Sequence, residues 1–400
     1  MIDGHRINLV ATQHLKLPWI ERWLDQDTIC GFHSSSFIVY SVYSGTPLAE
    51  IECGGGHRSW DYNGRNFAFI KDKEVLLAKR IIKENVVKCG GHLKEINCVE
   101  QLRFGEESFI VTGGEDTTMK LWRTSLNPIA TLRRHISSIK CLAVEDYSMD
   151  ERLLATAGGR SELRLWVVTQ DKATGKIGCN ELACHFLKGN DKQRQRNWRE
   201  HDLIDDNEPF YSSIVILKSK IIIACSDGAL RLWSFSSSQL KLEKQSDPLP
   251  NALLKLQKTA DGQLLTGDTI GRLMLWNEDL QLVKSIENVH QNGINAMLSL
   301  NGSVISGGDD GKIAITRLDT KSVTKSIPSH SAAHITALLE VNDGLCCVSV
   351  DQRISFFTRE LEWCNQAFSN CPDIASSVFI PQENLLIVIG SNGLERFLIG

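Results

Sequence analysis

Residues whose side chains can do chemistry recur along the chain in one order: a histidine, a hydroxyl residue, an aspartate and a tryptophan. The most complete set is His92, Thr112, Asp116 and Trp122. A histidine placed between a hydroxyl and a carboxylate is the arrangement that activates the nucleophile of many hydrolases. The set must therefore be interpreted either as a catalytic site or as a device that holds the chain together.

Altered copies of the set appear further along the chain, and this repetition favours the structural role. His135, Thr156 and Trp166 form the second copy, with Arg160 where the aspartate is expected. Later copies keep fewer members: Asp227 and Trp233 with Ile223 at the hydroxyl position, Thr266 and Trp276 with Ile270 at the aspartate position, and His290, Ser306 and Asp310 without the tryptophan. An enzyme needs one active site, whereas every unit of a repeat protein needs its own structural set. We therefore predict no catalytic residue.

The spacing of the copies defines a repeat. Trp122 and Trp166 are 44 residues apart, and Trp233 and Trp276 are 43 apart. Each tryptophan closes a short apolar segment that follows a tight turn, as in VTGGEDTTMKLW (111–122), which predicts two antiparallel strands. A period of about 40–45 residues with a terminal tryptophan resembles WD-repeat propellers. The sequence thus predicts an all-β fold, a WD-repeat β-propeller.

Counting strand pairs gives more units than one ring holds comfortably, since propellers have about four to eight blades. We expect one seven-bladed ring over residues 86–400, with an insertion at 170–209 and a closing strand at Val86–Cys89. Residues 1–85 are then two degenerate repeats, the tail of a preceding propeller in a longer protein. A single ring of eight or nine blades is the alternative.

Composition excludes several classes of function. Hydrophobic residues make up 42% and charged residues 23% of the chain, as in ordinary soluble globular proteins. The net charge of −4 confines any nucleic-acid binding to a local patch. No apolar run is long enough for a membrane span. The twelve cysteines contain no C-x-x-C pair, so we expect free thiols and a cytoplasmic location.

Motifs for metals and cofactors are also missing from the sequence. The histidines are dispersed, and the single H-x-x-x-H pair, His330 and His334, lies in a Ser/Ala loop. The glycine run 54–56 has neither the spacing nor the following helix of a dinucleotide site. We therefore predict no metal and no cofactor on this chain.

A cluster of basic residues in the insertion is the main candidate binding site. It consists of Lys188, Lys192, Arg194, Arg196 and Arg199 around Trp198. Arginine pairs with phosphates and stacks on bases, as indole rings do, so this composition suits RNA. The alternative is a solvated loop, because acidic residues at 202–208 nearly cancel the charge. Arg58, beside Trp60 in the glycine-rich loop, is a second RNA-binding candidate.

Several phrases together resemble one family of WD-repeat proteins. They are GGGHRSWD (54–61), GGHLKEINC (90–98), TGGEDTTMKLW (112–122), HISSIK (135–140) and TAGGRSELRLW (156–166), followed by the arginine-rich insertion. The family is the regulatory subunit of the tRNA methyltransferase that modifies the ribose 2'-O of the wobble nucleotide.

The resemblance implies a role for each recurring residue and for the chain. Within a blade it implies that histidine lies in the loop entering the blade, threonine in the second strand, aspartate in the turn and tryptophan in the third strand. The chain would be a non-catalytic scaffold that binds tRNA and recruits the catalytic subunit, and only that partner would bind S-adenosylmethionine. A general WD-repeat adaptor in a ubiquitin-ligase or trafficking assembly is the alternative function.

Overall fold

The structure is a computed structural model, and it describes most of the chain: residues 2–3, 6–7, 17–26, 28–42, 46–64, 66–79, 81–83, 91–171, 174–186, 209–217, 219–236, 239–259, 262–300, 302–320, 322–329, 333–342, 344–391 and 393–399. The closing strand predicted at Val86–Cys89 lies outside these residues. Within them, no helix has the length and apolar character that a membrane span requires.

Contacts divide the chain into two compact units. The smaller unit contains Met1–Asn85, Cys364–Phe368 and Ile399–Gly400, and the larger contains Val86–Trp363 and Ser369–Leu398. All the recurring sets belong to the larger unit.

The larger unit consists of antiparallel sheets in which consecutive strands pair with one another. Its strands are β11 (Ile96–Phe104), β12 (Glu107–Gly114), β13 (Met119–Arg123), β14 (Pro128–Leu132), β15 (Ile139–Asp146), β16 (Glu151–Gly158), β17 (Glu162–Gln170), β18 (Ile177–Phe186), β19 (Tyr211–Leu217), β20 (Lys220–Cys225), β21 (Leu230–Phe235), β22 (Leu240–Gln245), β23 (Leu253–Lys258), β24 (Leu264–Asp268), β25 (Leu273–Trp276), β26 (Leu282–Ile286), β27 (Ile294–Leu300), β28 (Ser303–Gly308), β29 (Lys312–Arg317), β30 (Ser322–Pro328), β31 (Ile335–Val341), β32 (Gly344–Ser349), β33 (Arg353–Thr358), β35 (Ser376–Ile380), β36 (Leu385–Gly390) and β37 (Gly393–Ile399).

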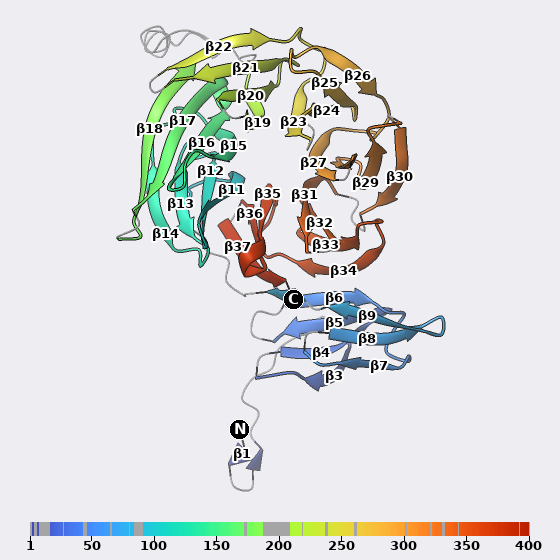
Figure 1. The fold of residues 1–400 in the computed structure, drawn as a ribbon. Coiled ribbons are helices and arrows are strands. Elements are labelled where there is room, and N and C mark those ends of the chain that lie inside the picture. The colour runs from blue at the N-terminus through green and yellow to red at the C-terminus, as the bar shows by residue number, and fades with distance from the viewer. Residues whose placement is uncertain are drawn as a thin grey trace, which may run out of the picture. The chain divides into compact units, whose positions relative to one another are not determined.

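The sheets close into a ring. The innermost strands are β11, β15, β19, β23, β27, β31 and β35; each contacts the next, and β35 contacts β11 (Figure 1). Closure removes the exposed edges that an open stack of sheets would leave. The larger unit is therefore a seven-bladed β-propeller, and the predicted all-β propeller fold is confirmed. We number its blades from β11 onwards, so that blade 1 is β11–β14.

Blades 1 to 6 repeat the same irregularity between their first and second strands, and the last blade pairs these strands without a register shift. The pairing of the first strand with the second shifts register near the start of the first strand. The shift lies between Ile96 and Cys98 in blade 1 and between Ile139 and Cys141 in blade 2. A second shift lies just before the tryptophan, between Leu121 and Trp122 in blade 1. Such bulges increase the local twist of the strands. Their recurrence shows that the blades share one design.

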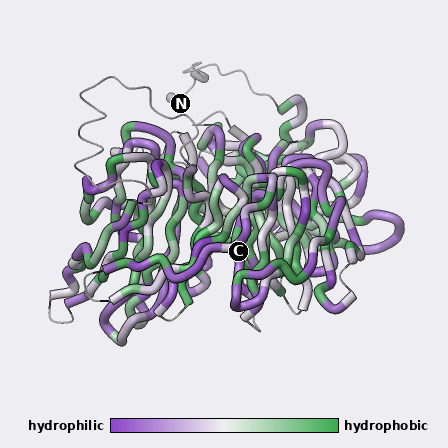
Figure 2. The backbone as a smooth tube through the Cα atoms, turned by 90° about the horizontal axis from the view of Figure 1, so that it is seen from above, coloured by the Kyte–Doolittle hydropathy of each residue, from purple (hydrophilic) through white to green (hydrophobic). Residues whose placement is uncertain are grey.

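The hydrophobic core lies between neighbouring blades. Trp122 packs with Ile380 and Ile387 of the last blade, and Trp166 packs with Leu102 and Val111 of blade 1. Both tryptophans are at most 1% exposed. Apolar residues concentrate along the strands, whereas the loops are mostly hydrophilic (Figure 2). Burying a large apolar side chain stabilises the folded state by about 1.5–3 kcal/mol. The tryptophan of each blade, or the residue that replaces it, therefore helps to hold that blade against its neighbour.

The smaller unit is also built of strands. They are β1 (Ile2–Asp3), β2 (Arg6–Ile7), β3 (Trp19–Trp23), β4 (Thr28–His33), β5 (Ser36–Ser41), β6 (Thr46–Glu52), β7 (Trp60–Tyr62), β8 (Asn66–Lys71), β9 (Glu74–Lys79), β10 (Ile81–Lys83) and, paired with β6, residues 364–368 of β34 (Trp363–Phe368). An aromatic cluster forms its core, in which Phe37 and Phe67 stack with ring centroids 4.0 Å apart. That this unit is the tail of a preceding propeller stays a prediction.

Candidate functional site: the blade networks and the central channel

The structure brings the four residues of the first set together in blade 1. His92 Nδ1 lies 2.9 Å from Asp116 Oδ1, and His92 Nε2 lies 2.9 Å from Thr112 Oγ1. The indole Nε1 of Trp122 donates to the same Thr112 oxygen at 2.9 Å. The set is a continuous chain from the turn carboxylate to the buried indole.

The chemistry of the partners fixes the protons in this network. A carboxylate only accepts, so His92 Nδ1 carries the proton that points to Asp116. The other ring nitrogen then accepts the hydroxyl proton of Thr112, whose oxygen accepts from Trp122. Burial lowers the pKa of His92, which favours this neutral ring. Thr112 is fully buried and both its bonding roles are occupied, so it has no free hydroxyl to act as a nucleophile.

Blade 2 repeats the network with a different acid. His135 Nε2 contacts Thr156 Oγ1 at 2.8 Å, and Trp166 Nε1 donates to that oxygen at 2.9 Å. The carboxylate comes from Glu162, which our sequence analysis did not single out; its Oε2 lies 3.3 Å from His135 Nδ1. Arg160 occupies the aspartate position without taking over the aspartate's role.

Glu162 is fully buried and ionised. Its Oε1 accepts a 2.7 Å hydrogen bond from Arg164 Nε, and its Oε2 accepts one from the backbone of Ile136 at 3.0 Å. Burial alone would raise the pKa of Glu162, but contacts with His135 and Arg164 outweigh it and lower the pKa to about 2. Glu162 thus performs the loop-holding function of Asp116.

Blade 4 also has a compensating acid that the sequence analysis missed. Trp276 Nε1 donates to Thr266 Oγ1 at 2.9 Å, as expected. The buried carboxylate is Asp268, two residues before Ile270, and it accepts from the Arg272 backbone at 2.9 Å and from Arg272 Nε at 2.7 Å. The turn between the second and third strands of a blade needs a buried hydrogen-bond acceptor, and a residue near the usual aspartate position can supply it.

Blades 3 and 5 keep partial networks. In blade 3, Asp227 forms a two-point ion pair with Arg231, and the Trp233 ring packs on His185 with centroids 4.6 Å apart. In blade 5, His290 contacts Asp310 at 3.0 Å and Ser306 at 2.9 Å. Neither arrangement leaves a histidine with an exposed hydroxyl beside it.

Most of the predicted RNA-binding residues cannot be placed. Lys188, Lys192, Arg194, Arg196, Trp198 and Arg199 lie outside the described residues, so their role stays a prediction. Arg58 is described and belongs to the smaller unit, where its side chain lies against Gly54: a Cβ on that glycine would come within 2.6 Å of Arg58 Nε.

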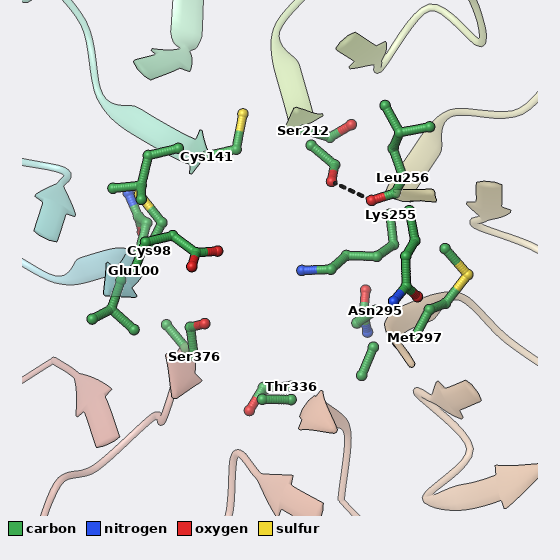
Figure 3. A pocket seen from close by; sticks show the side chains of 18 of the residues that line it. Cys98, Glu100, Cys141, Ser212, Lys255, Leu256, Asn295, Met297, Thr336 and Ser376 are labelled. Atoms are coloured by element: carbon green, nitrogen blue, oxygen red, sulfur yellow. Dashed lines mark hydrogen bonds between the residues drawn. The ribbon is translucent and has the colours of Figure 1, made fainter. Parts of the chain in front are cut away.

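A channel of about 540 Å³ runs through the centre of the ring and is lined by all seven innermost strands. Polar side chains near the blade ends join neighbouring blades: Asn97 donates to the Ile139 carbonyl at 2.8 Å, and Ser212 donates to the Leu253 carbonyl at 2.5 Å. Glu100 of β11 and Lys255 of β23 point toward the centre from opposite sides (Figure 3).

Enclosure by the ring perturbs the acid of this channel. Burial among the surrounding blades raises the pKa of Glu100 to about 7, although the side chain faces the open channel, and Lys255 partly offsets the rise. Cys98 of β11 and Cys141 of β15 also line the channel. Burial raises the pKa of both thiols, that of Cys141 to about 12. The channel therefore contains no activated thiol at neutral pH.

The described residues contain no group of three or more His, Cys, Asp or Glu side chains that could hold a metal ion. Of the predicted histidine pair, His330 lies outside the described residues. His334 is placed, with its Nδ1 3.3 Å from Asp309 Oδ1.

The closed ring and its repeated histidine, hydroxyl, carboxylate and tryptophan networks define a WD-repeat β-propeller. In agreement, the family "WD domain, G-beta repeat" matches residues 83–123 and 126–166. These ranges contain the blade 1 and blade 2 networks.

More specific relatives share one name, "tRNA (34-2'-O)-methyltransferase regulator WDR6". The Mus musculus protein is 25% identical over 87% of this chain and 42% of its own length. The proteins of Pongo abelii and Homo sapiens are each 24% identical over 92% of this chain and 44% of their own. The resemblance inferred from sequence phrases is thereby confirmed. The chain spans less than half the length of these curated relatives.

Among solved structures, the computationally designed Ika8 protein matches with a TM-score of 0.53 and 15% identity, covering 96% of both chains. This similarity supports the fold alone.

Proposed function

We propose that the chain is a non-catalytic scaffold that regulates a tRNA 2'-O-methyltransferase. It binds tRNA and recruits the catalytic subunit, which binds S-adenosylmethionine and methylates the ribose of the wobble nucleotide. We place this activity in the cytoplasm.

The observation that carries the proposal is the similarity to the WDR6 regulators, which extends over 87–92% of the chain in the mouse, orangutan and human proteins. A short WD match alone would indicate only a propeller. An alignment through nearly the whole chain, with proteins that share one regulatory role, is specific enough to propose that role for this chain and to test it.

The geometry of the blades supports a non-catalytic role. The hydroxyls of Thr112 and Thr156 are fully buried and serve the tryptophans of their own blades. Rigid scaffolds of this kind acquire function through their loops. The basic insertion residues Lys188 to Arg199 and Arg58 remain our first candidates for RNA contact.

Reconstitution of methyl transfer tests the proposal. We expect the purified full-length protein alone to transfer no methyl group to tRNA, the catalytic subunit alone to be slow, and the two together to methylate the wobble ribose rapidly. Equal rates with and without the scaffold would contradict the proposal. Stable association with ubiquitin-ligase or trafficking components instead of the methyltransferase would favour the adaptor function.

A further inference from the structure

We propose that the loops of blades 1 and 2 form a binding surface for the phosphate backbone of tRNA. We call this surface the cationic sector and define it by Lys94, Arg133, Arg134, Lys140 and Arg160. The inference rests on the proposed function, because that function supplies the RNA, and it adds a location made of described residues.

These residues lie on one face of the ring. In an antiparallel blade, the loop before the first strand and the turn between the second and third strands are at the same end. The His92–Asp116 contact joins these two segments in blade 1, and the His135–Glu162 contact joins them in blade 2. Lys94 and Arg133–Arg134 belong to the preceding loops, and Arg160 belongs to the blade 2 turn.

Neighbouring blades bring the two sets of loops together. Lys140 of blade 2 forms an ion pair with Glu115 in the blade 1 turn. Asn97 of blade 1 donates to the Ile139 carbonyl of blade 2. The basic residues therefore belong to one continuous surface.

Three of the five cations of the sector are available to a ligand. Lys94, Arg133 and Arg134 are exposed and form no hydrogen bond or ion pair with any residue that the structure describes. The acids of these loops and turns are Glu95, Glu115, Asp116 and Glu162. Glu115 already pairs with Lys140, and Asp116 and Glu162 accept hydrogen bonds from the loop backbone. The sector thus keeps a net positive charge, although the whole chain has a net charge of −4.

The same face of the other blades is acidic. Its described acids outside the ion pairs with arginine include Asp247, Glu287, Asp309 and Asp373, and Asp309 contacts His334. Several cations there are neutralised within their own turn: Arg231 pairs with Asp227, Arg272 with Asp268 and Arg353 with Asp351. A polyanion is attracted to blades 1 and 2 and repelled by the remaining sectors. The charge asymmetry therefore selects where RNA binds and how it is oriented.

Buried carboxylates hold the basic loops rigidly. The Leu93 backbone donates to Asp116 at 2.8 Å, and the Ile136 backbone donates to Glu162 at 3.0 Å. A loop that is ordered before binding loses less conformational entropy when the ligand arrives. The C-terminal end of the insertion also reaches this surface, since Ser161 Oγ donates to the Pro209 carbonyl at 2.5 Å. The blade networks thus position phosphate-binding side chains.

Salt dependence of RNA binding tests the sector directly. We compare the full-length protein with the double variant Arg133→Ala/Arg134→Ala, using fluorescence anisotropy with a labelled tRNA at graded salt. Removing one cation that binds a phosphate should reduce the slope of log affinity against log salt by about 1, so the double variant's slope should fall by about 1.5–2. At low salt its affinity should fall roughly tenfold.

The matched control is Lys258→Ala/Arg317→Ala. It removes the same charge from exposed residues at strand ends on the opposite face of the ring. We expect its slope and affinity to equal those of the unmodified protein. Unchanged thermal unfolding of both variants confirms that the fold is kept, as the exposure of all four residues predicts.

The possible outcomes separate this inference from the proposed function. If the unmodified protein binds no tRNA, the RNA-binding part of the proposed function fails and the inference fails with it. If it binds, and the slope of the sector variant is unchanged or falls equally in the control, only the sector is wrong. RNA binding that is kept while the methyltransferase subunit no longer associates would make the sector a protein interface and would overturn the inference.

Discussion

Glu162 is the residue whose environment says most about how a blade is held together. It is fully buried, it contacts His135 and Arg164, and it fixes the backbone of the loop at Ile136. Its depressed pKa links ionisation to stability. Because the folded pKa of about 2 lies below the ordinary 4.5, ionised Glu162 stabilises the fold above pH 4.5, and this stabilisation is lost as the pH falls toward 2.

We predict that Glu162→Gln lowers the free energy of unfolding at pH 7 by about 3 kcal/mol, because His135 and Arg164 lose a buried anionic partner. Glu181→Gln is the matched control, since Glu181 also pairs with Arg164, at 2.9 Å, but is partly exposed; it should cost less than about 1 kcal/mol. Urea denaturation at pH 7 and between pH 4.5 and 2 measures both effects. Equal losses in the two variants would contradict the role given to Glu162.

The sequence could not reveal this acid, because the network does not require it at one position. In blade 1 the carboxylate belongs to Asp116 in the turn, in blade 2 it comes two residues after Arg160, and in blade 4 two residues before Ile270. A comparison of repeats position by position detects only the missing aspartate. The longer glutamate side chain and the local fold of each turn supply the substitute, and both are three-dimensional properties.

The blade turn is the element that sets the shape of the repeat. The residue after the aspartate position has a positive φ in six blades: Thr117 (63°), Ser161 (49°), Gly228 (78°), Gly271 (80°), Gly311 (69°) and Gln352 (73°). This left-handed conformation favours glycine, yet three blades use a residue with a Cβ. The chain accepts the strain there because the turn hydrogen bonds fix the backbone.

We predict that Gly271→Ala destabilises the protein more than Gly302→Ala. Both glycines have a positive φ, so both variants incur the left-handed strain of about 1–2 kcal/mol. A Cβ at Gly271 would also lie 2.2 Å from the His290 carbonyl oxygen, whereas nothing lies within 4 Å of a Cβ at Gly302. Thermal unfolding of both variants measures the difference. Equal melting temperatures would mean that this close approach does not constrain the turn.

The blades themselves could be predicted from the sequence. The spacing from Trp122 to Trp166 and from Trp233 to Trp276 predicted the blades, because each buried tryptophan must return to the same place between two sheets. The 67-residue gap between Trp166 and Trp233 predicted an insertion at 170–209, but its bounds were wrong, because Ile177–Phe186 of this range form β18 and pair with β17 as the fourth strand of blade 2. The strand bulges were not predictable, since no residue type at Ile96 or Leu121 marks them.

The whole ring creates an environment that no blade has alone. Glu100 and Lys255 are 155 positions apart in the chain and face each other only because the seven blades close around the channel. The sequence therefore contained no sign of this pair. The raised pKa of Glu100 means that ionising it opposes folding, so the contribution of Glu100 to stability is most favourable below about pH 4.5 and declines as the pH rises through 7.

We predict that Glu100→Gln flattens this pH dependence. The variant should be more stable than the unmodified protein at pH 8 and should differ little from it at pH 5, where Glu100 is mostly protonated in the folded state. Melting temperatures at the two pH values measure the effect. A variant that is less stable than the unmodified protein at pH 8 would show that ionised Glu100 and Lys255 stabilise the ring.

The central claim is that this propeller serves tRNA methylation without performing it. Mass spectrometry of tRNA from cells that lack the gene tests the claim most directly. The account predicts loss of 2'-O-methylation at the wobble nucleotide, recovery when the gene is returned, and unchanged methylation at positions served by other enzymes. Normal wobble methylation in cells without the gene would contradict it.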